Sequence, residues 1–264
     1  MITNLQNPRI KNIIKLQQKS SERKRKEKFI IEGKRELSIA QQSRFDTLEI
    51  YLCEDIYKYD TCYPIEMSKQ NTIPASIDVY NKIAYRKNSE GVIAVAKMKN
   101  RGLSNLILSP VPLIMVIESV EKPGNLGAIL RTADAAKVDA VIICDPKTDL
   151  YNPNVIRSSL GCVFSNQVIA CSTEEVIEWF NKNSINIYIA TPESDKYYYE
   201  LNYTKPSAII FGSESEGLSK KWNFLSKNKI TIPMKGKIDS LNVSVSTAIV
   251  IFEAIRQRNQ LSVK

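Results

Sequence analysis

Three strand-to-helix junctions in the second half of the chain constrain its fold more than any other feature. They are residues 125–133 (NLGAILRTA), 211–219 (FGSESEGLS) and 232–246 (IPMKGKIDSLNVSVS). Each follows an apolar run that is typical of a buried strand, and each opens a run with helical apolar periodicity. In an open α/β sheet, ligands bind where strands end and helices begin. The three junctions therefore predict one composite site at one edge of a sheet.

Strands and helices alternate throughout the second half of the chain. The expected strands are residues 113–117, 140–144, 167–170, 186–190, 207–211 and 229–232, and the expected helices are residues 126–136, 154–160, 174–181, 218–226 and 241–257. Continuous apolar strands that alternate with helices are typical of a parallel sheet covered on both faces. The expected fold class is therefore α/β.

The first hundred residues predict a separate, smaller α/β domain. Its expected helices are residues 1–19, 34–42 and 76–84, and its expected strands are residues 29–31, 48–52, 65–68 and 91–96. Residues 97–112 contain a glycine and two prolines and little periodicity, which is typical of a connection. The expected organisation is a domain of residues 1–98, a linker of residues 99–111 and a domain of residues 112–264.

Positive charge is concentrated in the first domain. Residues 1–100 contain 19 Lys and Arg against 12 Asp and Glu, whereas the remainder contains 18 against 16. Such a basic segment is suited to a polyanion. The candidate residues for binding that polyanion are Arg9, Lys11, Arg23, Lys24, Arg25, Lys26, Lys34 and Arg35. For the cluster at 23–26, a solvated surface explains the sequence equally well.

The composition also excludes several kinds of site. The chain has no histidine, which removes imidazole bases and the usual zinc hydrolase sites. Its five cysteines include no CxxC pair, so neither a zinc site nor a disulfide framework is expected. The glycines form neither a GxGxxG nor a Walker A pattern. No apolar run has the length of a membrane span and no signal-peptide pattern opens the chain, so we expect a cytoplasmic protein.

Arg131 and Glu214 are the candidate charged pair of the first two junctions. Arg131 stands in an apolar run, where a buried guanidinium would need an anion, either a carboxylate such as Glu214 or a phosphate. The alternative is a surface arginine on a capped helix and a solvated acid in a glycine turn. Neither spacing alone distinguishes these interpretations.

The third junction predicts a ligand pocket and a helix cap. Its apolar residues Ile232, Met234 and Leu241, set among polar backbone, suit a mostly apolar pocket with a few fixed polar contacts. Asp239 or Ser240 is expected to cap the last helix, with Asn242 in its first turn. This helix is apolar nearly all round, which predicts a second buried face and a homodimer through the C-terminal domain.

Together the three junctions resemble the three signature motifs of the SpoU family of RNA ribose 2'-O-methyltransferases, in the SPOUT superfamily. The resemblance covers about residues 112–258, and two segments of the first domain, KFIIEGKRELSIAQ and SEGVIAVAK, resemble the family's substrate-binding domain. It implies a trefoil-knot α/β domain, an obligate homodimer, RNA as substrate with ribosomal RNA favoured, and S-adenosylmethionine as methyl donor without a metal. It implies catalytic roles for Asn125, Arg131, Glu214, Ser240 and Asn242, and cofactor contacts from Thr191, Gly212, Ile232, Met234 and Leu241.

Within this resemblance we expect Arg131 to act as a fixed cation that stabilises the developing alkoxide and holds a phosphate. The family often has glycine where Lys137 stands, which puts the turn after this helix in doubt. Three alternatives stay open: an RNA-binding or ribosome-assembly protein without turnover, a tRNA methyltransferase, and an antibiotic-resistance methyltransferase. A nicotinamide-dependent oxidoreductase is disfavoured because its glycine pattern is missing.

Overall fold

The computed structural model describes residues 1–86, 89–213, 215–224 and 228–261. The chain divides into two compact units: unit 1 comprises residues 1–100 and 149–165, and unit 2 comprises residues 101–148 and 166–264. Among the described residues, no helix is both long and apolar enough to cross a membrane.

Unit 1 is built on a four-stranded sheet with the order β1-β4-β2-β3. Strands β1 (Lys28–Glu32), β4 (Val92–Lys97) and β2 (Thr47–Leu52) are antiparallel neighbours, and β3 (Thr72–Pro74) pairs with β2 in parallel. Helices α1 (Pro8–Gln18) and α4 (Ile77–Ile83) pack their apolar sides, including Ile10, Ile13 and Val79, onto one core of this sheet. The basic stretch forms α2 (Ser20–Lys26), and α3 (Lys34–Gln42) follows β1.

Residues 149–165 complete the core of unit 1, although the sequence places them in the second domain. They contain α6 (Pro153–Ser158) and α7 (Cys162–Ser165). The rings of Phe29 and Tyr151 stack with centroids 4.3 Å apart, and Phe164 stacks on Phe29 at 5.7 Å. The guanidinium of Arg23 donates to the carboxylate of Asp149 at 2.7 Å. Through this ring stacking and this ion pair, residues 149–165 pack as part of unit 1.

Unit 2 has a six-stranded sheet with the order β10-β8-β9-β5-β6-β7, in which every pairing is parallel. The strands are β5 (Leu113–Glu118), β6 (Ala140–Cys144), β7 (Val168–Cys171), β8 (Asn186–Ala190), β9 (Ser207–Phe211) and β10 (Lys229–Ile230). All residues of the central strands β5, β6 and β9 are buried, as a sheet covered on both faces requires. The expected α/β class with a parallel sheet is confirmed.

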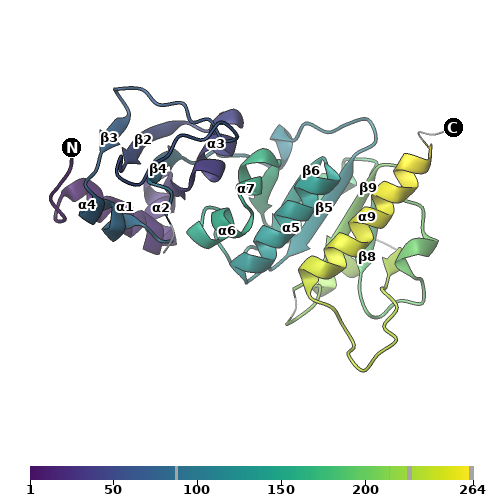
Figure 1. Ribbon diagram of the computed structural model, residues 1–264. Coiled ribbons are helices and arrows are strands. Elements are labelled where there is room, and N and C mark those ends of the chain that lie inside the picture. The colour runs from purple at the N-terminus through teal and green to yellow at the C-terminus, as the bar shows by residue number, and fades with distance from the viewer. Residues whose placement is uncertain (87–88, 214, 225–227, 262–264) are drawn as a thin grey trace. The chain divides into compact units, whose positions relative to one another are not determined.

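Helices cover both faces of this sheet. Figure 1 shows α5 (Pro123–Ala136) and α9 (Val243–Leu261) side by side over one face. On the other face, α8 (Thr173–Asn181) and the 3-10 helix η3 (Lys220–Phe224) contribute Val176, Phe180 and Trp222 to a core with β5, β6, β8 and β9. Two further 3-10 turns, η1 (Leu103–Asn105) and η2 (Tyr198–Glu200), lie in the connections.

Some expected elements differ from the structure. Residues 65–68 are not a strand, and the edge strand that pairs with β2 is β3 at Thr72–Pro74. The helix expected at 218–226 is only the short η3 within the described residues. The turn after α5 keeps the left-handed geometry that glycine would supply, because Lys137 itself adopts φ 49° and ψ 48°. The doubt that Lys137 raised about this turn is therefore removed.

Candidate functional site

A cavity of about 500 Å³ opens at the carboxyl ends of β8, β9 and β10. All five predicted cofactor residues line it: Thr191, Gly212, Ile232, Met234 and Leu241. Ser240 and Asn242, predicted to be catalytic, line it as well. The cavity therefore combines the ends of three neighbouring strands with the start of α9, as the junction pattern predicts.

The lining suits an amphiphilic small molecule. Apolar side chains from Phe211, Ile230 and Val250 join those of the third junction, and hydroxyls come from Thr191, Ser213 and Ser246. The volume falls within the range of small-molecule and cofactor sites, about 300–1,000 Å³. Such a lining can enclose a flat apolar ring and still offer hydrogen bonds to hydroxyl and amino groups.

Gly212 packs directly against the backbone of a neighbouring loop. A β-carbon placed on Gly212 would lie 2.2 Å from the carbonyl carbon of Gly217 and 2.4 Å from its oxygen. The loop closes on itself, because Ser213 N donates to Gly217 O at 3.0 Å and Gly217 N donates to Ser213 O at 3.1 Å. Gly212 is thus required by this hairpin, and the hairpin in turn forms a wall of the cavity. Predicted catalytic Glu214 falls in this loop but outside the described residues.

A second, smaller cavity of about 170 Å³ shares a wall with the first. Gly212, Ser213 and Val243 line both cavities. Asn125 and Lys122 line only the smaller one. Two compartments that share a wall can hold two molecules beside each other.

Asn125 and Asn242 connect the first and third junctions. The Nδ2 of Asn242 donates to the Oδ1 of Asn125 at 3.3 Å. The Oδ1 of Asn242 also accepts from the backbone nitrogen of Ser244 at 2.9 Å, so Asn242 is the N-cap of α9. The expectation that Asp239 or Ser240 caps this helix is wrong, because α9 begins at Val243.

Arg131 lies on the solvent side of α5 and is exposed. The helix turns Leu126, Ile129, Leu130 and Ala133 to the core and leaves Arg131 on the opposite side. The expectation of a buried guanidinium is therefore wrong. Within the part of the chain that the structure describes, Arg131 makes no hydrogen bond or ion pair, so its guanidinium can receive an external anion.

Glu118 is a buried acid that sequence reasoning missed. Its side chain is 3% exposed, and its carboxylate accepts from the backbone nitrogen and hydroxyl of Ser219, both at 2.7 Å, and from the hydroxyl of Thr173 at 3.1 Å. It ties the end of the second junction to the end of β5. The sequence feature that could have identified Glu118 is an acid at the end of an apolar strand.

Tyr198 also lines the larger cavity and was not predicted. The sequence feature that could have identified it is the run of three tyrosines at 197–199.

Lys147 forms two ion pairs beside the hairpin. Lys147 contacts the carboxylate of Glu121 at 2.7 Å and that of Glu216 at 3.6 Å. The ammonium group of Lys147 lowers the pKa of Glu121 below its ordinary value. These charges are exposed and screened by solvent, so they contribute little to stability.

The predicted RNA-binding cations do not share one environment. Arg23 is buried, with its side chain 2% exposed, and donates to the backbone oxygens of Leu16 and Gln17 as well as to Asp149. This burial argues against the predicted RNA contact by Arg23, because its guanidinium is already bound to groups within unit 1. Arg9, Lys11, Lys24 and Arg25 are exposed; Lys26 contacts Glu22 and Asn12; Lys34 contacts Asp60; and Arg35 lies over the ring of Tyr63.

The described residues contain no group of three or more His, Cys, Asp or Glu side chains that could hold a metal ion. The cysteines of unit 2 are poor nucleophiles: burial raises the pKa of Cys171 to about 12 and raises that of Cys144 further.

Comparison with known proteins gives consistent matches for both parts of the chain. The SpoU rRNA Methylase family matches residues 112–252, and the MRM3-like substrate binding domain matches residues 7–94. The 23S rRNA (guanosine(2553)-2'-O)-methyltransferase RlmP of Bacillus subtilis is 26% identical over 95% of this chain and 97% of its own.

Solved structures match over nearly the whole chain. The crystal structure of an RNA 2'-O ribose methyltransferase is 38% identical, with a TM-score of 0.83 over 98% of this chain and 99% of its own. The SpoU methyltransferase AviRb of Streptomyces viridochromogenes, in complex with the cofactor AdoMet, is 25% identical, with a TM-score of 0.86 over 96% of this chain and 100% of its own.

Proposed function

Because the chain belongs to the SpoU rRNA methylase family, we propose that it is an RNA 2'-O-ribose methyltransferase that acts on ribosomal RNA with S-adenosylmethionine as methyl donor. The observation that carries this proposal is the two-compartment site, in which residues of all three junctions meet. The relative from Bacillus subtilis acts on 23S rRNA, which favours ribosomal RNA over tRNA. A cytoplasmic location is part of the proposal.

We assign the larger cavity to the cofactor. Its volume, apolar lining and hydroxyls fit an adenosine with an amino-acid tail. Ile232, Met234 and Leu241 would enclose the adenine ring, and the backbone at Gly212 would face the ligand from the hairpin. When bound, S-adenosylmethionine supplies a methyl group on a positively charged sulfur, which needs no metal for transfer. The support for this assignment is the lining and the cofactor complex of AviRb.

We assign the smaller cavity to the ribose that is methylated. Asn125, fixed by the hydrogen bond from Asn242, would orient the ribose beside the shared wall, with Ser240 on the cofactor side. Arg131 lines neither cavity. As an exposed cation it would bind an RNA phosphate, and its predicted role is to stabilise negative charge on the 2'-oxygen as the hydroxyl proton passes to solvent water. Orientation of the two reacting groups supplies much of the remaining rate enhancement. The role of Glu214 stays a prediction.

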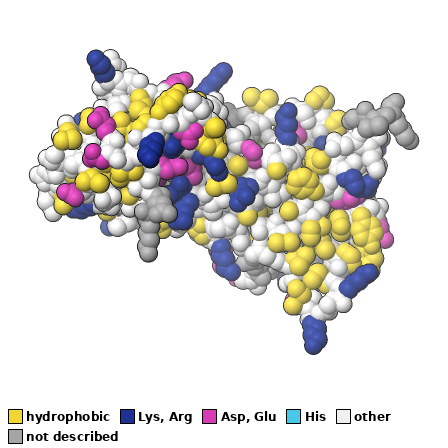
Figure 2. Space-filling view, in the orientation of Figure 1, with side chains coloured by type: hydrophobic (Ala, Val, Ile, Leu, Met, Phe, Trp, Pro, Cys, Tyr) yellow, Lys and Arg dark blue, Asp and Glu magenta, His cyan; other side chains and the backbone are white. Residues whose placement is uncertain are grey.

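We further propose a homodimer through α9. Val245 and Phe252 are 46% and 47% exposed and lie seven residues apart on one side of the helix, with Ala248 and Ile249 between them. Figure 2 shows hydrophobic side chains gathered over α9 and the segments beside it. A second copy would cover this apolar face. A monomer mass by light scattering at micromolar concentration would contradict the dimer.

The trefoil-knotted path of the chain in unit 2 also stays a prediction.

Calorimetric titration with S-adenosylmethionine tests the assignment of the larger cavity. We expect one binding site per chain, and loss of that binding on Leu241→Arg, which places a charged side chain in the cavity. Failure of the wild-type chain to bind would instead favour the RNA-binding protein without turnover.

A further inference from the structure

Unit 1 contains an open groove that includes no residue of the three junctions. Its volume is about 580 Å³, and its walls come from α1, from the end of α4 and the loop after it, and from the start of α6. Its polar and aromatic lining residues are Gln17, Gln18, Lys82, Tyr85, Asn152 and Asn154. All of these residues belong to unit 1, so the groove exists only because residues 149–165 are built into that unit.

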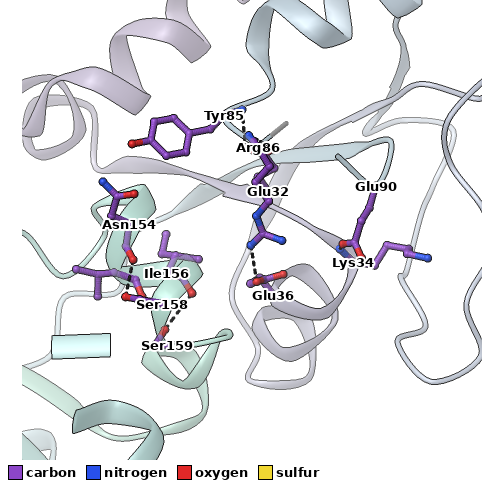
Figure 3. Close-up of polar contacts among 11 residues, drawn as sticks. Glu32, Lys34, Glu36, Tyr85, Arg86, Glu90, Asn154, Ile156, Ser158 and Ser159 are labelled. Atoms are coloured by element: carbon purple, nitrogen blue, oxygen red, sulfur yellow. Dashed lines mark hydrogen bonds and ion pairs between the residues drawn. The ribbon is translucent and has the colours of Figure 1, made fainter. Parts of the chain in front are cut away.

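Tyr85 provides a flat aromatic surface in this groove. Its side chain is 50% exposed. Its backbone is fixed, since Glu32 accepts hydrogen bonds from the backbone nitrogens of Tyr85 and Arg86 at 2.9 and 3.0 Å. Figure 3 shows the Tyr85 ring and the Asn154 side chain on the same side of these contacts. A large ring held open to solvent can stack with a flat ligand without prior rearrangement.

Carboxamide side chains line the same groove as this ring. Within the described residues, the side chains of Gln18 and Asn154 make no hydrogen bond, although both line the groove. The neighbouring backbone is fixed, because Gln17 donates to Ile83 O at 2.6 Å and Asn152 accepts from Asn154 N at 2.9 Å. A carboxamide offers a donor and an acceptor together, which matches the edge of a nucleobase.

The charges around the groove suit a nucleic-acid backbone. Lys82 lines it, and no acidic residue does among the described residues. Lys11 and Lys15 are exposed on the side of α1 that also carries Ile14 and Gln18 of the groove. These cations can hold phosphates on either side of a stacked base.

We propose that this groove binds one unpaired nucleotide of the RNA substrate, with its base stacked on Tyr85 and its edge hydrogen-bonded to Gln18 and Asn154. The inference rests on the proposed function, because RNA is the ligand. Proteins recognise unpaired bases by aromatic stacking and by hydrogen bonds to their edges. The groove would hold a nucleotide other than the one that is methylated and would help to select the RNA site.

Fluorescence anisotropy tests this groove. It measures the binding of the full chain to four labelled single-stranded RNA dodecamers, each made of one of the four bases. We expect the affinity of Tyr85→Ala for the preferred dodecamer to fall about tenfold, because the substitution removes the stacking of a base on the ring. Tyr85→Phe keeps the ring and should stay within about twofold of wild type. Tyr59→Ala removes another tyrosine of unit 1, 73% exposed, and is the matched control with wild-type affinity.

Two further variants separate base contacts from phosphate contacts. Asn154→Ala should reduce the difference in affinity between the four dodecamers. Lys15→Ala should weaken all four and lower the slope of log affinity against log salt by about 1, whereas Tyr85→Ala should leave that slope unchanged. Melting temperatures of all variants should match wild type, because the substituted side chains are exposed.

The proposal is overturned if Tyr85→Ala binds like Tyr59→Ala, if Tyr85→Phe is as weak as Tyr85→Ala, or if the wild-type chain binds none of the dodecamers. Methyl transfer by the wild-type chain from S-adenosylmethionine to total RNA from cells that lack this protein is measured in parallel. A wild-type chain that binds S-adenosylmethionine but transfers no methyl group contradicts the proposed function. An active wild-type chain with an unaffected Tyr85→Ala variant contradicts only the groove.

Discussion

The Nδ2 of Asn242 donates a hydrogen bond to the Oδ1 of Asn125 at 3.3 Å, across 117 positions of sequence. Asn242 lines the larger cavity and Asn125 the smaller one. The same Asn242 side chain caps α9 through its Oδ1. One carboxamide therefore fixes the start of a helix and orients a residue of the proposed ribose compartment, and substitution can separate these two tasks.

Asn242→Asp should separate them. The aspartate keeps an oxygen for the N–H of Ser244, so the cap and the stability remain. It loses the N–H that Asn125 accepts, so kcat should fall at least tenfold. Asn242→Ala should lose activity and also about 1 kcal/mol of stability. Single-turnover methyl transfer and chemical denaturation measure the two effects; equal activity of Asn242→Asp and wild type would contradict the role given to this contact.

Gly212→Ala should damage the cofactor site. The new β-carbon would lie 2.2 Å from the carbonyl carbon of Gly217, so the hairpin must move, with a loss of about 1–3 kcal/mol of stability. Affinity for S-adenosylmethionine, measured by calorimetry, should fall at least tenfold. Gly124→Ala is the matched control, because its β-carbon would meet no atom within 4 Å. Equal cofactor affinity of the two variants would refute this account of the wall.

Arg131→Ala should abolish methyl transfer and leave cofactor affinity within about twofold. Loss of a positioned charge at a developing oxyanion typically costs about 10²–10³ in rate. Because Arg131 is exposed, stability should change by less than about 0.5 kcal/mol. Arg131→Lys keeps the charge but not the planar fork, and an intermediate rate is expected. Turnover near wild type in Arg131→Ala would remove Arg131 from the mechanism.

Arg23→Ala should destabilise unit 1. The substitution leaves the Asp149 carboxylate, largely buried, without its cationic partner and with the hydrogen bonds from Ser20 Oγ and Tyr151 N, which costs about 3 kcal/mol. Arg25→Ala, in the same helix but with an exposed, solvent-screened ion pair to Glu22, should leave the melting temperature close to that of wild type. Thermal unfolding distinguishes them. If Arg23→Ala unfolded like Arg25→Ala and lost only RNA affinity, the earlier expectation of an RNA contact would be restored.

Lys137→Gly should stabilise the protein by about 1 kcal/mol, since Lys137 occupies the left-handed region at φ 49°. Lys137→Ala removes the same side chain but keeps the unfavourable backbone, so it should not be stabilising. Denaturant unfolding of the two variants isolates the backbone effect; a destabilised glycine variant would contradict it.

The sequence predicts much of unit 2, because a buried parallel strand is a continuous apolar run. Strands β6, β8 and β9 have the predicted bounds, and the junctions that follow the strands do meet at one cavity. Arg131 was misjudged because an apolar run surrounds it, although the helix turns its side chain to solvent. The cap of α9 was misjudged because three polar residues, 239, 240 and 242, compete for that position.

The packing of residues 149–165 in unit 1 could not be predicted from local sequence. It depends on contacts with residues more than a hundred positions away, such as Phe164 on Phe29 and Asp149 with Arg23. For the same reason, removal of residues 1–100 would leave Tyr151 and Phe164 without the ring of Phe29. A truncated chain is therefore a poor test of which residues bind RNA, and point substitutions are preferable.

Transfer of labelled methyl groups to total RNA from cells that lack this protein tests the central claim most directly. The purified chain is incubated with labelled S-adenosylmethionine, and the product is mapped for ribose methylation, with Arg131→Ala as the inactive control. The account predicts label on the 2'-oxygen of a single nucleotide in ribosomal RNA. Label on a base rather than a ribose, or label only in tRNA, would contradict it.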